Sequence, residues 1–185
     1  MVKEVIKQAE EKMKGVIAAT KREFAAVRTG RANPAILDRV TVNYYGTATP
    51  LSQLANIATP EPRLITIQPW DRTAVKEIEK AILQSDLGLT PNSDGQIIRL
   101  AIPPLTGERR KELVRLVRKQ AEEMRVVIRG IRREVNDAIK GLEKDGNLPQ
   151  DEARRQEKVV QEMTDRYIQE VDQLLAQKEQ EIMEV

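Results

Sequence analysis

Apolar residues recur at helical spacing through the first segment of the chain. Between Val2 and about Thr29, the steps from one apolar position to the next alternate mostly between four and three residues, which is typical of a helix packed along a seam. Gly30 follows at once and Pro34 lies a few residues beyond, and both residue types favour a helix end. The sequence therefore predicts a long first helix whose seam is Val2, Ile6, Ala9, Met13, Val16, Thr20, Phe24 and Val27.

Two further helices are predicted in the C-terminal part of the chain. The second begins after Pro103–Pro104, with Thr106 as its N-cap, and its steps of three and four residues run without a break through Val114, Val117, Ala121, Met124, Ile128, Ile131, Val135, Ala138 and Leu142. A tight turn is expected at Gly146, and Pro149 suits the first turn of the next helix. The seam of this third helix is Val160, Met163, Tyr167, Val171, Leu174 and Ile182.

These three helices are long for a globular protein. At a rise of 1.5 Å per residue they would measure roughly 40, 60 and 50 Å. An elongated antiparallel three-helix bundle within one chain is favoured, because three seams of similar length are available to pack together. The alternative is an open coiled coil, which would expose an apolar seam and dimerise.

The segment between the first and second helices has a different pattern. Residues 39–45, 63–68 and 96–102 alternate as strands do, whereas residues 72–84 form an amphipathic helix. Most prolines lie in this segment or at its edges. We therefore expect an α+β protein, with a discontinuous bundle (residues 1–30 and 105–185) and an inserted small domain (residues 31–104). The two connections predict a hinge at Gly30, Arg31, Pro103, Pro104, Leu105 and Thr106.

Composition narrows the classes of function. The chain has no cysteine and no histidine, so it lacks thiol nucleophiles, the commonest general base and the commonest transition-metal ligands. We therefore expect that the chain is not an enzyme and that it binds no metal ion and no cofactor. The segment 92–95 is expected to be a turn rather than a calcium loop, because Ala101 stands where a bidentate glutamate would be needed. No apolar run or leader pattern is found, so a cytoplasmic protein without membrane contact is expected.

The second helix carries the clearest candidate binding surface. The chain has a net charge of only +2, but residues 109–133 hold ten basic residues against three acidic ones. If the seam occupies heptad positions a and d, the e positions are all basic: Lys111, Arg118, Arg125 and Arg132. Guanidinium groups hold phosphate through two hydrogen bonds, so this basic strip fits an RNA backbone. The alternative is a solvated helix face whose cations pair with acids on neighbouring helices.

Two further observations refine the RNA interpretation. Arg28 and Arg31 flank Gly30 at the end of the first helix, where they serve equally well as cations near a helix C-terminus or as phosphate ligands. The basic helix has no aromatic residue, and Phe24 and Tyr167 fit the buried seams. Because single-stranded bases need exposed aromatic residues for stacking, the expected target is structured RNA bound through phosphate and shape.

Several longer strings resemble the ribosome recycling factor family. They follow one another in the family's order and span essentially the whole chain, which makes the combined match specific. They are VRTGRANP at 27–34, YYGT at 44–47, TPL at 49–51, SDLGL at 85–89, PN at 91–92, IPPLT at 102–106, ERRK at 108–111 and RVVIRGIRR at 125–133. Gly107 and Gly130 depart from the usual family residues, and neither removes a predicted contact.

The resemblance implies an L-shaped protein with a three-helix bundle as the long arm and a small β/α/β sandwich domain as the short arm. It implies a monomer that binds large-subunit ribosomal RNA in a post-termination ribosome and acts with elongation factor G and GTP to separate the subunits. The family's RNA-contacting arginines correspond to Arg28, Arg31, Arg110, Arg129 and Arg132, with Arg118, Arg125 and Arg133 as further matching arginines.

Overall fold

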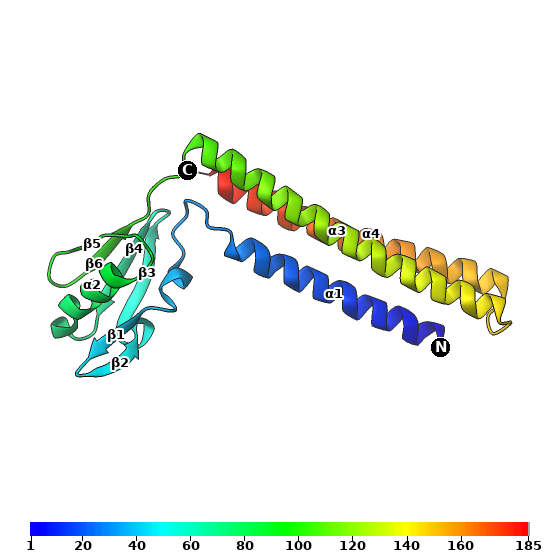
Figure 1. The fold of residues 1–185 in the computed structure, drawn as a ribbon, viewed down its shortest axis with the longest axis horizontal. Coiled ribbons are helices and arrows are strands. Elements are labelled where there is room, and N and C mark those ends of the chain that lie inside the picture. The colour runs from blue at the N-terminus through cyan, green and yellow to red at the C-terminus, as the bar shows by residue number, and fades with distance from the viewer. Residues whose placement is uncertain (185) are drawn as a thin grey trace. The chain divides into compact units, whose positions relative to one another are not determined.

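A computed structural model describes residues 1–184 and divides the chain into two compact units (Figure 1). Of the described residues, one unit contains 1–28 and 107–183, and the other contains 29–106 and Glu184. Among residues 1–184, no helix is long and apolar enough to cross a membrane.

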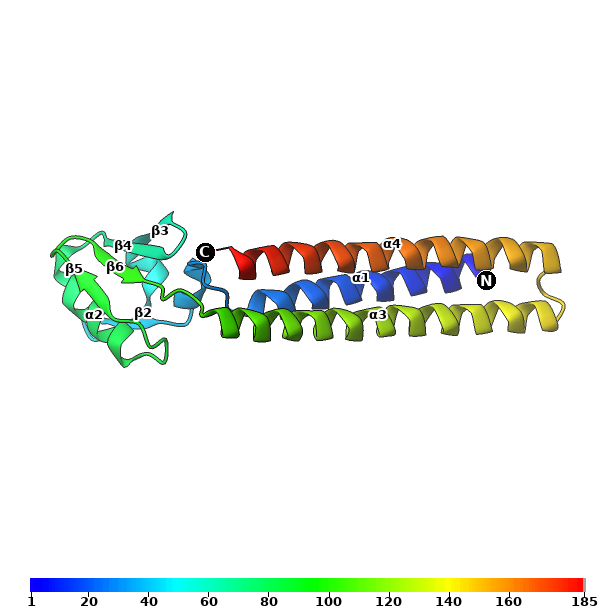
Figure 2. The ribbon, with the colours of Figure 1, turned by 90° about the horizontal axis from the view of Figure 1, so that it is seen from above.

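The first unit is a bundle of three long helices that lie side by side (Figure 2). They are α1 (Val2–Ala26), α3 (Gly107–Lys144) and α4 (Gln150–Met183). Helix α3 runs antiparallel to the other two (Figure 2), and each helix contacts both of its neighbours. The α+β fold class with an intramolecular bundle is thereby confirmed, in place of an open coiled coil.

The buried seams agree with the predicted ones on α1 and α4 more closely than on α3. Helix α1 buries Ala9, Met13, Val16, Ile17, Thr20 and Phe24, and α4 buries Val160, Met163, Tyr167 and Val171 among others. On α3 the prediction is wrong at both ends, because Leu113 and Ile139 are buried whereas Val114 is only half-buried and Ala138 is exposed. A strict heptad repeats every 3.5 residues, but a straight helix turns every 3.6 residues. The buried residue therefore lies one position before the predicted one at the start of α3 and one position after it at the end.

The ends of the helices are set by local backbone chemistry. Helix α1 ends at Ala26, because Val27 is already extended while its N–H still donates to the Phe24 carbonyl. Gly30 is therefore not the residue that ends this helix. A Cβ added at Gly30 would lie 3.4 Å from Leu105 Cγ, an ordinary van der Waals contact, so the two chain connections of the second unit lie close together here. Between α3 and α4, Gly146 takes a left-handed φ of +77° in the predicted tight turn.

The second unit contains two small sheets and one α-helix (Figure 1). A hairpin of β1 (Thr41–Tyr44) and β2 (Thr47–Pro50) forms one sheet. The other sheet is antiparallel throughout and has the strand order β3-β4-β6-β5. Its strands are β3 (Ala55–Glu61), β4 (Leu64–Pro69), β5 (Pro91–Ser93) and β6 (Ile98–Ala101). The helix is α2 (Val75–Gln84), and short 3-10 turns lie at Pro34–Leu37, at Leu51–Gln53 and, directly before α2, at Arg72–Ala74.

The strands β1 and β6 and the helix α2 fall within the predicted segments, and β4 extends one residue beyond its segment, to Pro69. The strands β2, β3 and β5 were not predicted. All three unpredicted strands contain a proline, and proline reads as a break in a strand. Pro60 lies in β3 and Pro91 in β5, and these are the two edge strands of the four-stranded sheet. A proline is tolerated there because an edge strand has one side without ladder hydrogen bonds.

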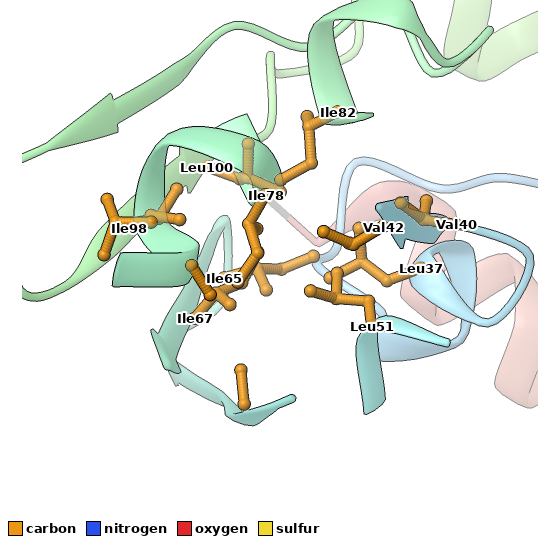
Figure 3. Packing of buried hydrophobic residues seen from close by; sticks show 13 residues of the cluster. Leu37, Val40, Val42, Leu51, Ile65, Ile67, Ile78, Ile82, Ile98 and Leu100 are labelled. Carbon is orange, nitrogen blue, oxygen red and sulfur yellow. The ribbon is translucent and has the colours of Figure 1, made fainter. Parts of the chain in front are cut away.

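The core of the second unit is formed by aliphatic residues from the sheets and from α2 (Figure 3). Alternate residues of β4 and β6 point inward, among them Ile65, Ile67, Ile98 and Leu100, and Ile78 and Ile82 of α2 pack against them. All six side chains are completely shielded from solvent. The unit therefore has a closed core of its own, as an independently folding domain requires.

Candidate nucleic-acid interface

Arginines along one edge of α3 are hydrogen-bonded to helix α4. Arg118 Nε lies 2.5 Å from Glu179 Oε1, Arg125 Nη2 lies 2.7 Å from Asp172 Oδ1, and Arg132 Nη1 donates to the Gln161 side-chain oxygen at 2.8 Å. The predicted e row thus lies along the boundary between α3 and α4. Pairing with acids of a neighbouring helix is therefore found for Arg118 and Arg125.

These pairs hold the two helices together to different degrees. Arg125 is 19% exposed and also contacts Glu122 at 3.0 Å, so it joins α3 to α4 from a partly shielded position. Burial alone would lower the pKa of Arg125, but the hydrogen bonds that it donates to Asp172 and Glu122 raise it. Arg118 is 64% exposed, although the hydrogen bond to Glu179 raises its pKa too. Because exposed ion pairs contribute about 0–1 kcal/mol, Arg125 is the stronger link.

Arg132 differs from these two arginines because its partner is neutral. The amide oxygen of Gln161 accepts a hydrogen bond but leaves the guanidinium charge uncompensated. The Nε atom of Arg132 is also buried without a hydrogen-bond partner. Within residues 1–184, four buried side-chain polar atoms lack a partner and all four belong to α3: Arg110 Nε, Gln120 Oε1, Arg132 Nε and Asn136 Oδ1.

An unpaired buried donor needs an explanation, since it costs about 1–3 kcal/mol. The unpaired donors of Arg110 and Arg132 are Nε atoms of guanidinium groups. No carboxylate among the described residues pairs with either of these charges. Both residues are half-buried, so the stem of the side chain is held while part of the group reaches the surface. Both groups therefore leave a positive charge near the surface that no acidic side chain of the described residues pairs with.

The outward face of α3 carries Arg129 and Arg133, one helical turn apart. Arg129 Nη1 lies 3.2 Å from Glu122, and the same carboxylate contacts Arg125. The hydrogen bonds from Arg125 and Arg129 lower the pKa of Glu122, so this carboxylate stays ionised at neutral pH. Arg133 is exposed and makes no side-chain hydrogen bond or ion pair within the described residues. One glutamate thus serves two arginines and leaves a net positive charge.

Arg28 and Arg31 lie at the junction between the units and differ in their surroundings. Arg28 is exposed, and no ion pair joins it to another residue among positions 1–184. Arg31 Nη1 lies 3.8 Å from Glu184 Oε2, and both side chains are more than half exposed. That distance is close to the upper limit for an ion pair, so Arg31 is only weakly compensated.

We define the uncompensated set as Arg28, Arg110, Arg132 and Arg133, and the paired set as Arg118 and Arg125. Arg110 and Arg133 were assigned through the family resemblance, and the residues alone left the role of Arg28 open. The charge pattern placed Arg118, Arg125 and Arg132 in one row. It contained no signal that separates them, because the positions of Glu179, Asp172 and Gln161 relative to α3 depend on how the helices pack.

None of the aromatic residues belongs to α3. Phe24 and Tyr167 are buried, as predicted. The Tyr167 hydroxyl donates to Glu10 of α1 at 3.0 Å, and burial together with this hydrogen bond raises the pKa of Tyr167 to about 12. In the second unit, Tyr45 and Trp70 are strongly exposed. Within residues 1–184, no group of three or more acidic side chains is placed to hold a metal ion.

Comparisons with known proteins all point to one family. The family model described as ribosome recycling factor matches residues 20–183. The chain is 57% identical to the ribosome-recycling factor of Desulforamulus reducens and 56% identical to that of Bacillus subtilis, in each case over the full length of both chains. It is also similar to a solution structure of the ribosome recycling factor, with a TM-score of 0.74 and 43% identity over 100% of this chain and 98% of the other.

A second solved structure adds a functional setting. It contains the ribosome recycling factor of T. thermophilus and the elongation factor G of E. coli, bound to the E. coli post-termination complex. The recycling factor in it is 47% identical to this chain, and the match covers all of both chains with a TM-score of 0.64.

Proposed function

Since the chain belongs to the ribosome recycling factor family, we propose that it binds the post-termination ribosome and, with elongation factor G and GTP, promotes subunit separation and release from mRNA. The observation that carries this proposal is the full-length similarity to curated recycling factors, one of which is seen with elongation factor G on a post-termination complex. As a ribosome-bound factor the protein acts in the cytoplasm, as a monomer.

The bundle provides the RNA-binding surface in this proposal. The residues assigned to large-subunit ribosomal RNA are Arg28, Arg31, Arg110, Arg118, Arg125, Arg129, Arg132 and Arg133. Their pairing supports a division of labour. The uncompensated set binds phosphate directly, because its charges meet no carboxylate in the described chain. The paired set holds α3 against α4 and keeps the other arginines in position.

The protein performs no bond chemistry in this scheme. Its bundle binds RNA, and its second unit offers a surface to the elongation factor. GTP hydrolysis by that factor supplies the free energy. The connections at Gly30–Arg31 and 103–106 act as the hinge about which the second unit moves. Gly30 lies close to Leu105, which is consistent with closely spaced connections at this point.

A subunit-splitting assay tests the proposal. Purified post-termination ribosomes are mixed with the protein, elongation factor G and GTP, and splitting is followed by light scattering. Splitting is expected only when all three components are present. Ribosomes that remain intact in the complete mixture, with a known recycling factor active in parallel, would refute the proposed function.

A further inference from the structure

Lysines on one face of helix α1 form a second basic row, in which one of the four members has an acidic partner at long distance. Lys3, Lys7, Lys14 and Lys21 are all exposed, and their spacings of four, seven and seven residues keep them on one face. At 3.6 residues per turn, Lys21 lies about five full turns from Lys3. We call these four residues the lysine row. The apolar seam of α1 occupies a different face, buried against α3 and α4.

Of the acids near this row, one is engaged with α4 and another pairs with a lysine of the row at long distance. Glu10 accepts a hydrogen bond from the Tyr167 hydroxyl and lies 4.0 Å from Arg166, so it serves the contact between α1 and α4. Glu11 approaches Lys14 only to 3.9 Å. Within residues 1–184, no ion pair joins Lys3, Lys7 or Lys21 to a carboxylate. By contrast, Lys12 lies on another side of α1, where it contacts Glu134 of α3 at 3.5 Å.

The chemistry of the row fits a phosphate backbone better than a protein surface. A protein interface has large apolar or aromatic residues at its centre, but between these lysines the exposed face offers only small or polar residues such as Gly15 and Ala18. Lysine binds phosphate as a point charge without demanding a fixed geometry. Neighbouring lysines seven residues apart are separated by about 10.5 Å along the helix, so one extended strand can contact several of them.

We propose that the lysine row is a second RNA-binding edge of the bundle, which contacts the phosphate backbone of ribosomal RNA. The row approaches the junction, where Arg28 follows Lys21 after seven further residues and is likewise uncompensated. This inference rests on the proposed function, because it takes the ribosome as the target. It adds to the α3 surface a second contact on a different helix.

The test compares two sets of lysines on the same helix. The variant Lys7→Gln/Lys14→Gln/Lys21→Gln and the control Lys12→Gln are titrated with isolated large ribosomal subunits at several salt concentrations. The triple variant is expected to bind about tenfold more weakly at low salt, and its slope of log affinity against log salt should fall by about two to three. The control, whose lysine faces Glu134, should keep the wild-type slope.

A conservative variant separates charge from structure. Lys7→Arg/Lys14→Arg/Lys21→Arg keeps the charges and should retain the wild-type slope. An unchanged slope and affinity in the glutamine variant would overturn the proposal. Weaker binding without a change of slope would also overturn it, because that result indicates a contact with protein rather than with phosphate. If the wild-type protein splits ribosomes while the glutamine variant binds normally, only the lysine row is wrong and the proposed function stands.

Discussion

The arginines along the edge of α3 that contacts α4 have the same chemistry but different surroundings. Arg125 lies between Asp172 and Glu122 and is mostly shielded, so its charge is used within the bundle. Arg132 lies on the same edge one heptad later, but it meets the neutral Gln161 and keeps an unpaired Nε. A single change of partner, from carboxylate to amide, therefore separates an arginine whose charge is paired within the bundle from one whose charge has no acidic partner among the described residues.

The largest expected effect concerns ligand binding by the uncompensated set. Arg110→Ala/Arg132→Ala removes two guanidinium groups whose Nε atoms lack internal partners. Each lost charge-assisted contact should cost about 1.5–3 kcal/mol of binding free energy, or on the order of a hundredfold or more in affinity for both. Titration with large ribosomal subunits measures this loss. Unfolding by urea should show little loss of stability, because no internal ion pair is removed.

The paired set should show the opposite balance. Arg125→Ala leaves Asp172 without its partner on α3. Because Arg125 is mostly shielded but Asp172 is half exposed, the unfolding free energy should fall by about 1–2 kcal/mol, which is below the range for fully buried pairs. Urea unfolding of Arg125→Ala, Asp172→Asn and the double variant gives the coupling energy between the two side chains. A coupling close to zero would show that this pair does not hold α3 to α4.

The contact between α1 and α4 gives a prediction at alkaline pH. Tyr167 in the folded protein has its pKa raised from 10.0 to about 12. Its stabilising contribution is therefore fully present below pH 10 and is lost as the pH rises towards 12. The hydrogen bond to Asp71 also raises the pKa of Tyr44, so the absorbance of tyrosinate is compared between the wild type and Tyr167→Phe. The variant should lose a titration step near pH 12 and have an unfolding free energy lower by about 1 kcal/mol. A Tyr167 that titrates near pH 10 would contradict the hydrogen bond to Glu10.

The smallest effect concerns glycine within α3. Gly130 lies in the helix interior, and an added Cβ would meet no atom within 4 Å. Gly130→Ala should therefore raise the unfolding free energy by about 0.5–1 kcal/mol through helix propensity. Gly141→Ala is a matched control, since its surroundings are equally open. Thermal unfolding of both variants measures the gain, and a loss at Gly130 alone would reveal a packing role for that position.

The sequence predicted the parts of the molecule that depend on local periodicity. The three long helices and their seams follow from apolar spacing, and the strand at Arg63–Gln68 was found because its residues alternate. The strand containing Pro60 was not found, because an edge position that tolerates proline is a property of the assembled sheet. The buried position of Ile139, in place of Ala138, was missed because a strict heptad ignores the drift of a straight helix.

The sequence predicted which residues make up the candidate site, but not which of their charges are paired. The count of basic residues identified α3, yet the heptad assignment placed Arg118 and Arg132 in one equivalent row. Their difference depends on whether Glu179 or Gln161 lies opposite, which is set by the register of α4 against α3. The lysine row of α1 was not identified as a site at all, because Glu4, Glu10 and Glu11 mask its charge in the sequence.

The most direct test of this account is the rate of subunit splitting by two double variants in one assay. Post-termination ribosomes, elongation factor G and GTP are kept constant, and each variant is added at a concentration near the wild-type half-maximum. Arg110→Ala/Arg132→Ala should split ribosomes far more slowly than the wild type, whereas Arg118→Ala/Arg125→Ala should retain most of the activity below its unfolding temperature. Equal loss in both variants, or greater loss in the second, would contradict the division between uncompensated and paired arginines.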